Sequence, residues 1–413
     1  MADAASSTNE PEQPSTSKRP IVPAASFADV LKDLSKDDDS TQEEARWARS
    51  TQQQSDEARP SITRLFSSGN CEYKGLFTSP ELTYEAAVPY FLRFLIDSEI
   101  KAFTWLKLPS DKYHIVSPEK RVSTCQLEVS IDVDDLLICD PVDNKEKTTP
   151  LRVLSFDIEC SIPDKRDRFS SPKSDSVIQI ANMVTTYGQA VPFIRNVFTL
   201  GSCSAISGTQ VLSFEGEKDL LMAWHKFFVE VDPDVVIGYN ITQFDIPYLL
   251  HRSHTLKLPG FPFLGRIKAS PQRMPARDRT LFLECPGYEG RLILDVYHHI
   301  RERFPDLQGE GIYKLNGVSM HFLGQRKEDI DYLQIPALQN GNADSRRDLA
   351  VYCLKDVYLP LLLFEKLKCL EKEVKDAKDA HVPFNVMRVW RPCIEIAKQC
   401  LHAIQHQYVM ADK

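Results

Sequence analysis

The stretch LRVLSFDIECS at residues 151–161 ends an apolar run with two carboxylates that stand two positions apart. Residues i and i+2 of a strand project from the same face, so Asp157 and Glu159 are expected to point together from the end of a buried strand. Two ionised carboxylates at that separation repel each other, and a bound divalent cation removes the repulsion. The pair predicts a metal site, with a solvated strand end as the alternative for an isolated Asp-x-Glu.

The sequence around this strand alternates between strand and helix patterns, which predicts an α/β fold with helices packed on a sheet. A long amphipathic helix, a strand ending in GYN and a second helix follow the first three strands. The predicted strands cover residues 151–159, 177–188, 191–200, 232–240 and 291–295, and the predicted helices cover 217–231, 241–256 and 344–380.

The composition divides the chain into four expected parts. Residues 1–60 are rich in Ser, Thr, Pro, Gln and acidic side chains and are predicted to be a disordered tail. Residues 61–150 are expected to form a small, partial α+β unit, with a helix from about residue 83, that ends in a polar linker. Residues 151–370 form the predicted α/β domain, and residues 371–413 a helical C-terminal segment.

The overall composition excludes several classes of protein. No apolar run approaches the roughly 20 residues that span a bilayer, and the polar start MADAASSTNE lacks the apolar core of a signal peptide. The ten cysteines include no CxxC pair, so the spacing predicts neither a zinc site nor an iron-sulfur cluster. A net charge of −8 excludes a wholly basic nucleic-acid binder, but not a nucleic-acid enzyme with an acidic metal site.

A second polar cluster follows a predicted strand in GYNITQFD. Asn240 ends the strand, and Asp245 falls in the first turn of the next helix. A first-turn Asp also complements the helix dipole, which is the alternative for Asp245 alone. In open α/β sheets ligands bind at the carboxyl ends of strands, where Asp157, Glu159 and Asn240 all fall. Together with the aromatic Phe244, the cluster predicts a binding site at that edge.

A third cluster lies in RRDLAVYCLKDVYLP, where Tyr352 and Asp356 stand four residues apart. That spacing places both on one face of a helix, among apolar neighbours. An Asp inside a sheet-packed core needs a partner, and a local cap or ion pair is the alternative to a metal.

Three acidic clusters at the ends of separate elements, with a tyrosine one turn from the last, are typical of a two-metal phosphodiesterase. Hard oxygen donors without Cys or His spacing favour two Mg²⁺ or Mn²⁺ ions over zinc.

FDIE, NITQFD and YCLKD resemble, in this order, the three exonuclease motifs of the family B DNA polymerases. Longer stretches resemble the exonuclease domain of the delta-type catalytic subunits of that family: FPFLGR at 261–266, KLNGVSMHFLG at 314–324, LQNGN at 338–342 and LAVYCLKDVYLPL at 349–361. The likeness runs from about residue 83 to about residue 385.

The resemblance implies a ribonuclease-H-like fold with a mixed sheet and a metal-dependent 3′–5′ exonuclease of the proofreading type. By that likeness Asp157 ligates both metal ions, and Glu159 ligates one of them and contacts the attacking water. Asp245 and Asp356 complete the acidic set, and Tyr352 orients the water.

The same resemblance implies DNA as the partner, with a single-stranded or frayed 3′ end as the substrate. Asn240 and Phe244 match positions that contact the frayed end. Arg266, Arg346 and Arg347 are candidates for phosphate or base contacts, with a plain surface role as the alternative. The likeness further implies a nuclear location and replication proteins as partners, without a membrane.

The sequence departs from the family in one large respect. The DxxSLYPS-like and YxDTD-like polymerase motifs do not occur in it, so we do not expect polymerase activity from this chain. Two alternatives stay open: a fragment of a delta-type catalytic subunit, the DNA-directed DNA polymerase of DNA replication, and a non-catalytic DNA-binding or regulatory relative. Asp295, at the end of RLILD, is expected to be a structural or outer-shell acid.

Overall fold

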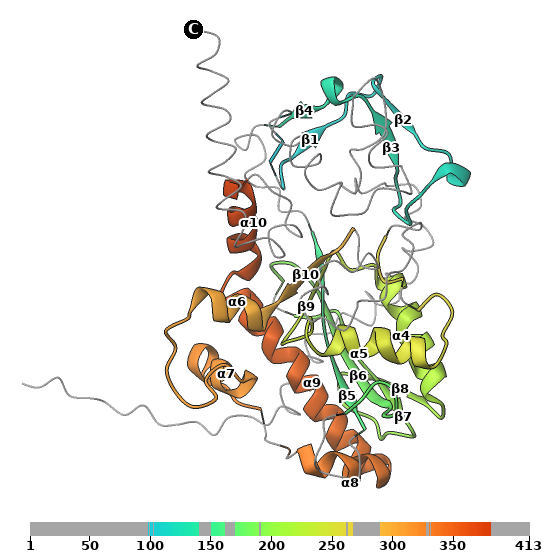
Figure 1. Cartoon of the computed structure of the whole chain (residues 1–413), viewed down its shortest axis with the longest axis vertical. Coiled ribbons are helices and arrows are strands. Elements are labelled where there is room, and N and C mark those ends of the chain that lie inside the picture. The colour runs from blue at the N-terminus through green and yellow to red at the C-terminus, as the bar shows by residue number, and fades with distance from the viewer. Residues whose placement is uncertain are drawn as a thin grey trace, which may run out of the picture.

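The chain folds into a small N-terminal unit and a six-stranded sheet with helices on both faces (Figure 1). The predicted tail at 1–60, most of the helix predicted from residue 83, and residues 381–413 lie outside the part that the structure describes. The residues described in this computed structural model are 98, 100–101, 103–139, 150–161, 170–189, 191–261, 263–266, 290–327, 330 and 332–380.

The described residues of the N-terminal unit contain two short antiparallel pairs of strands. Each pair joins segments that are well separated in the sequence, and 3₁₀ turns lie between the strands. The elements are β1 (Leu106–Lys107) paired with β4 (Leu137–Ile138), β2 (Tyr113–Ile115) paired with β3 (Val129–Ile131), η1 (Pro118–Lys120) and η2 (Val133–Asp135).

The large sheet has the strand order β10-β9-β5-β6-β7-β8. Every strand runs in one direction except β6, which is antiparallel to both of its neighbours, so the sheet is mixed as expected. The edge strand β8 was not predicted, because QVLSF is short and only partly buried. The strands are β5 (Arg152–Cys160), β6 (Val177–Thr186), β7 (Ile194–Leu200), β8 (Gln210–Phe214), β9 (Val235–Gly238) and β10 (Leu292–Asp295).

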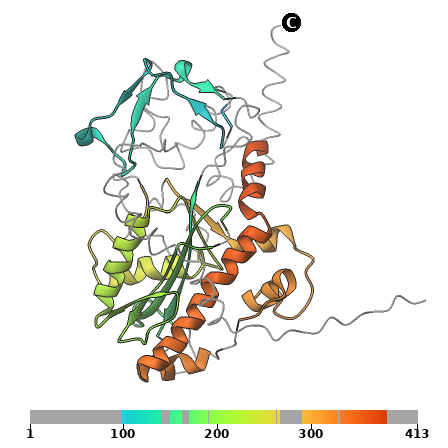
Figure 2. The same ribbon diagram turned by 180° about the vertical axis from the view of Figure 1, so that it is seen from behind.

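Helices cover the two faces of the sheet and form two apolar cores (Figures 1 and 2). One face packs against α4 (Glu217–Val231) and α5 (Asp245–Thr255). The other face packs against the long α9, which begins in a capping box. The elements on that side are α6 (Val296–Arg303), α7 (Leu315–Leu323), η5 (Tyr332–Gln334), α8 (Ile335–Asn340), α9 (Ala343–Lys366) and α10 (Cys369–Ala380).

Strand β5 lies between the two cores, and its side chains alternate between them. Phe156 points into the α4 and α5 side, where its ring lies 5.6 Å from that of Trp224. Val153 belongs to the α9 core, and the Ser155 hydroxyl donates a 2.8 Å hydrogen bond to the carbonyl of Val357 in α9. Because successive side chains of a strand point to opposite faces, the remaining odd-numbered residues of β5, Asp157 and Glu159, also point toward α9.

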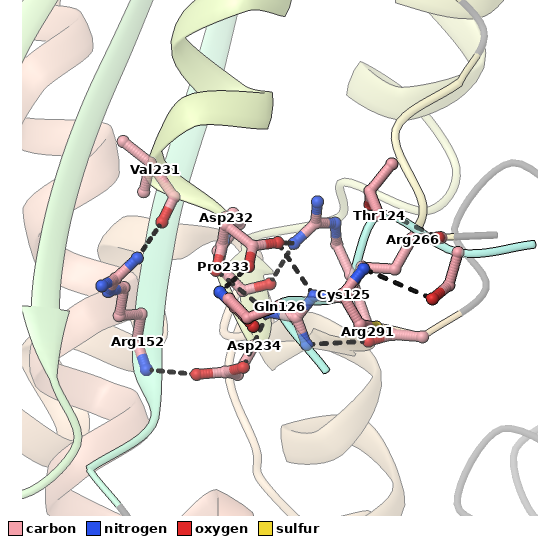
Figure 3. A network of polar contacts seen from close by, with 12 residues as sticks. Thr124, Cys125, Gln126, Arg152, Val231, Asp232, Pro233, Asp234, Arg266 and Arg291 are labelled. Atoms are coloured by element: carbon pink, nitrogen blue, oxygen red, sulfur yellow. Dashed lines mark hydrogen bonds and ion pairs between the residues drawn. The ribbon is translucent and has the colours of Figure 1, made fainter. Parts of the chain in front are cut away.

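A network of ion pairs connects the amino ends of β9 and β10 (Figure 3). Arg266 pairs with Asp232 and Asp234, each at 2.8 Å, and Arg291 pairs with Asp232 at 2.6 Å. The backbone N–H of Arg152, at the start of β5, donates to Asp234 at 2.9 Å. Arg266 is buried in this network, at the end of the sheet opposite to the predicted site, so it has neither the phosphate contact considered for it nor the plain surface role that was the alternative.

The same network holds the N-terminal unit against the sheet. The Thr124 N–H donates a 2.7 Å hydrogen bond to the carbonyl of Arg266. The Gln126 side chain donates to Asp232. Two polar residues of the N-terminal unit thus bind groups that the ion pairs already fix in position (Figure 3).

Gly238, the last residue of β9, is required by the close approach of its neighbours. A Cβ atom at this position would lie 2.2 Å from Cγ2 of Ile241 and 2.9 Å from the carbonyl oxygen of Phe156. We expect Gly238→Ala to lower the free energy of unfolding by about 1–3 kcal/mol, because Phe156 lies in the sheet and its backbone cannot give way. Urea unfolding followed by circular dichroism measures the loss. Gly188→Ala is the control. No described atom lies within 4 Å of the Cβ that it would add, so this substitution would show only the strain from the positive φ of 82°.

Candidate active site

The two acids of the opening motif lie where β5 continues beyond the end of β9. Strand β5 pairs with β9 only as far as Ser155. Beyond that point the backbone N–H of Ile158 donates a 3.0 Å hydrogen bond to Oδ1 of Asp245, the first residue of α5. Asp245 thus replaces the missing strand as the acceptor, and its buried carboxylate comes close enough to Asp157 and Glu159 to interact with both by charge.

Helix α9 supplies the third cluster from the opposite side. Asp157, Glu159 and Cys353 each offer one ligand atom, and these atoms lie within 4.8 Å of one another. The Cys353 sulfur is 3.8 Å from Oδ2 of Asp157. Asp356 is on the same helix and raises the pKa of both Asp157 and Glu159 by charge repulsion. The predicted residues of β5, α5 and α9 therefore come together.

Lys327 was not predicted, and it binds two of the predicted residues. Its ammonium donates at 2.7 Å to Oδ2 of Asp356 and at 2.6 Å to the hydroxyl of Tyr352. The ammonium also lies 4.2 Å from the centre of the Tyr352 ring. The only signal in the sequence is indirect, because a group of buried carboxylates requires compensating positive charge.

The buried carboxylates strongly perturb one another's protonation. Burial, followed by repulsion from Asp356, raises the pKa of Glu159 to about 8. Burial also raises the pKa of Asp245 to about 7, although the hydrogen bond from Ile158 opposes the shift. Burial and the charge of Asp245 raise the pKa of Asp157 well above its usual range. Among the described residues, the Lys327 ammonium pairs with Asp356 alone, and the raised pKa values show that the remaining acids ionise together only when positive charge is supplied. A bound divalent cation would supply it.

Asp295 holds the loop that follows β9, in agreement with the structural role expected for it. Its fully buried carboxylate accepts hydrogen bonds from the Asn240 N–H at 2.8 Å and from the Thr242 N–H and hydroxyl at 3.0 and 2.7 Å. It also caps α6 by accepting from the Tyr297 N–H at 3.0 Å. The acid therefore fixes the ends of β9 and β10 relative to each other.

The loop carries both predicted substrate-binding residues. Asn240 has a positive φ of 67°, a conformation that Asn tolerates better than most residues. Within the described residues its buried Oδ1 has no hydrogen-bond partner. Phe244 is 39% exposed, and its ring lies 5.6 Å from that of Tyr248. Helix α5 starts only after Phe244, at Asp245, rather than at Ile241 as the apolar pattern suggested.

The two other arginines considered as phosphate contacts have protein partners. Arg346 donates to the carbonyls of Ser202, Gln339 and Gly341. Arg347 pairs with the exposed carboxylates of its own helix, Asp344 and Asp348. Arg347 thus has the plain surface role that was the alternative, whereas Arg346 connects α9 to neighbouring backbone, a role that was not considered.

The comparison with known families identifies the family of the chain. Residues 81–318, more than half of the chain, match the protein family described as DNA polymerase family B, exonuclease domain. The chain belongs to this family. In the described part of this exonuclease domain, no helix is long and apolar enough to cross a membrane.

Curated relatives of the exonuclease domain include DNA polymerase delta catalytic subunits. The protein from Candida albicans is 44% identical over 316 residues, which are 75% of this chain and 29% of the relative. The protein from Schizosaccharomyces pombe is 42% identical over 337 residues, which are 79% of this chain and 30% of the relative. The protein from Bos taurus is 40% identical over 341 residues, 81% of this chain and 30% of the relative. The chain thus spans about 30% of the length of these relatives.

A solved structure confirms the fold of the exonuclease domain. The family B DNA polymerase from the hyperthermophilic archaeon Pyrobaculum calidifontis matches with a TM-score of 0.53 and 22% identity, over 76% of this chain and 35% of that one. The predicted ribonuclease-H-like fold with a mixed sheet is therefore confirmed.

Without metal, the carboxylate cluster should destabilise the exonuclease domain as the pH rises. The pKa of Glu159 is raised from 4.5 to about 8, so its protonated form favours folding. This contribution is complete below the unfolded value and is lost as the pH rises through about 8. In EDTA at a pH of about 8.5 we expect Glu159→Gln to stabilise the fold by roughly 1–3 kcal/mol, and at about pH 4 to have little effect. Thermal unfolding at both pH values measures the difference.

The exposed Asp306→Asn serves as the control for charge removal, since it should leave the melting temperature unchanged at both pH values. A Glu159→Gln variant that is equally stable to wild type in EDTA at high pH would show that the carboxylates do not repel one another as described.

Proposed function

We propose that this chain is a 3′–5′ exodeoxyribonuclease of the proofreading type, which hydrolyses single-stranded or frayed 3′ ends of DNA. One observation carries the proposal: acidic side chains from β5, α5 and α9 are gathered at the carboxyl edge of the sheet, where Asp245 accepts the Ile158 N–H and Asp356 binds Lys327 beside the Asp157 and Glu159 pair. The family membership supports the same reaction.

The donor set fits two Mg²⁺ or Mn²⁺ ions. Asp157, Glu159, Asp245 and Asp356 offer hard carboxylate oxygens, and their mutual repulsion favours bound divalent charge. Asp157 would contact both ions, Glu159 one of them, and the other two acids would complete the set. When bound, such ions act as Lewis acids that promote attack of water and departure of the 3′ oxygen.

Tyr352 and Lys327 would act on the reacting groups beside these acids. The Tyr352 hydroxyl accepts a hydrogen bond from Lys327, so its own proton is available to orient the attacking water. Burial, and next the charge of Asp356, raises the pKa of Tyr352 to about 12, so the phenol keeps this proton at neutral pH. The ammonium of Lys327 would stabilise the negative charge that grows on the phosphate.

The loop after β9 would hold the terminal nucleotides. The exposed ring of Phe244 offers a stacking surface for a base. The Oδ1 of Asn240, which has no hydrogen-bond partner among the residues that the structure describes, offers an acceptor for a base or sugar donor. Asp295 fixes the loop that carries both.

The test is a nuclease assay on the purified chain with a 5′-labelled oligodeoxynucleotide and Mg²⁺ or Mn²⁺. We expect stepwise shortening from the 3′ end and its loss in EDTA. A substrate whose last internucleotide linkage at the 3′ end is a phosphorothioate should be shortened more slowly. Intact substrate after long incubation with either metal would contradict the proposal and favour a non-catalytic DNA-binding or regulatory role.

The biological setting is proposed from the relatives, which are DNA polymerase delta catalytic subunits. We propose a nuclear location, a role in DNA replication and contact with replication proteins. We also propose that the domain boundaries lie at residues 60, 150 and 370. A primer-extension assay distinguishes an exonuclease from a chain that also polymerises DNA. Because the polymerase motifs are missing, we expect no extension, and an extended primer would contradict this expectation.

A further inference from the structure

A patch of aromatic rings around one exposed arginine lies beside the candidate site. The guanidinium of Arg301 lies over the rings of Tyr297 and Tyr313, at 5.7 and 5.3 Å from their centres. It also donates a 2.9 Å hydrogen bond to the hydroxyl of Tyr297. Tyr297 in turn packs edge-to-face against Tyr239, with ring centres 5.5 Å apart. We call these four residues the Arg301 patch.

The backbone holds the patch in place. The Tyr239 hydroxyl donates to the carbonyl of Tyr313, and the Tyr313 hydroxyl donates to the carbonyl of Phe304 at 2.7 Å. Tyr297 and Arg301 stand four residues apart on α6, so they share one face of the helix. Arg301 is exposed, and Tyr297 and Tyr313 are half-buried. The rings and the guanidinium are therefore preorganised, and part of their surface faces solvent.

The patch lies at the same edge of the sheet as the four acids, on the face that α9 covers. Strands β5, β9 and β10 are parallel neighbours, so their carboxyl ends meet at one edge. Helix α6 begins directly after β10, two strands from β5, a distance of about 10 Å. Its buried residues Val296 and Ile300 join the core of α9, toward which Asp157 points.

The loop with the proposed substrate contacts connects the patch to the site. Tyr239 immediately precedes Asn240, and the Gln243 side chain lies 3.2 Å from Nε2 of His298, the neighbour of Tyr297. The order along the edge is therefore the acids, the loop at 240–244 and then the Arg301 patch.

We propose that the Arg301 patch binds bases of the single DNA strand that lie on the 5′ side of the terminal nucleotide. The inference rests on the proposed function, since it concerns the strand that leads to the same site. A base can stack on a tyrosine ring or on a guanidinium plane, and such stacking tolerates any sequence. The positive charge attracts the phosphates that link these bases. The patch thus holds the strand while its 3′ end is in the site.

The experiment measures binding without cleavage. Fluorescein-labelled oligothymidylates of about 3 and about 12 nucleotides are titrated with the full chain in EDTA, and anisotropy is recorded. We expect Tyr297→Leu to weaken binding of the longer strand roughly tenfold and to leave the shorter strand within about twofold. Arg301→Lys keeps the charge but loses the planar surface, so it should also weaken only the longer strand.

Two controls separate stacking from other effects. Tyr297→Phe keeps the ring and should bind like wild type. Lys226→Ala removes an exposed positive charge from α4, on the other face of the sheet, and should leave both affinities unchanged. Melting temperatures within about 2 °C of wild type show that the variants are folded.

If folded variants lose affinity equally for both strands, or for neither, the proposal is overturned. The Arg301 patch is then a structural contact between α6 and its neighbours. Because no cleavage is required, this outcome is independent of the nuclease assay. If the variants lose affinity for the longer strand only, but the chain does not cut DNA, the proposed reaction is contradicted and the proposed role of the Arg301 patch is supported.

Discussion

Replacing Asp157 and Glu159 together by alanine is expected to lower the exonuclease rate by roughly 10³-fold or more, about 4 kcal/mol of transition-state stabilisation. These side chains are the two β5 members of the carboxylate cluster, within 4.8 Å of each other and of Cys353. Without them Asp245 and Asp356 cannot hold two divalent ions. Single-turnover shortening of a labelled oligonucleotide under saturating Mg²⁺ measures the change.

The double variant should still fold, because it removes repulsion between buried like charges and leaves the apolar residues of β5 intact. Its binding of the 12-nucleotide strand in EDTA should be at least as tight as that of wild type, since two negative charges are lost. A double variant that shortens DNA at the wild-type rate would show that these acids are not the metal ligands. The same result would attribute any observed nuclease activity to a contaminant.

Lys327→Ala is expected to reduce the exonuclease rate constant roughly 10²-fold, or about 3 kcal/mol. The substitution removes the ammonium that binds both Asp356 and Tyr352. Burial alone would lower the pKa of Lys327, but the Asp356 carboxylate and then Tyr352 outweigh burial and raise this pKa above its usual value. The rate constant at saturating DNA measures the effect, because the loss should fall on kcat rather than on KM.

The neighbouring Arg326→Ala is the matched control, since it removes one exposed positive charge at the adjacent position. It should change kcat less than about threefold, and any effect should disappear at higher salt, as expected for a surface charge. Lys327→Arg keeps the charge and should restore part of the rate. If Lys327→Ala and Arg326→Ala lower kcat equally, Lys327 acts only through the electrostatic potential of the protein surface.

The site could be predicted from the sequence where local periodicity fixes the direction of a side chain. The i, i+2 spacing placed Asp157 and Glu159 on one face of β5, and the structure has them beside α9. The four-residue spacing on α9 likewise placed Tyr352 and Asp356 where Lys327 binds both. In each case one strand or one helix decides the geometry, and tertiary packing only preserves it.

The remaining contacts join segments whose spacing carries no such signal. Lys327 lies in GQRKEDI, which has neither helical nor strand period, and it meets Asp356 only through the packing of its loop against α9. Arg266 belongs to a stretch that resembles the family, yet its position at the far end of the sheet depends on Asp232 and Asp234. The length of β9 relative to β5, which frees the Ile158 N–H for Asp245, is equally a property of the assembled sheet.

The ion pairs at the amino ends of the strands determine where this exonuclease domain can be shortened. Arg266 satisfies Asp232 and Asp234 with its side chain and Thr124 with its carbonyl, so the same residue supports the sheet and the N-terminal unit. Removing residues before Arg152 would leave the sheet but expose that carbonyl and the carboxylate that Gln126 contacts. A minimal exonuclease domain cut from this chain should therefore begin before β2, and its two parts should unfold in a single thermal transition.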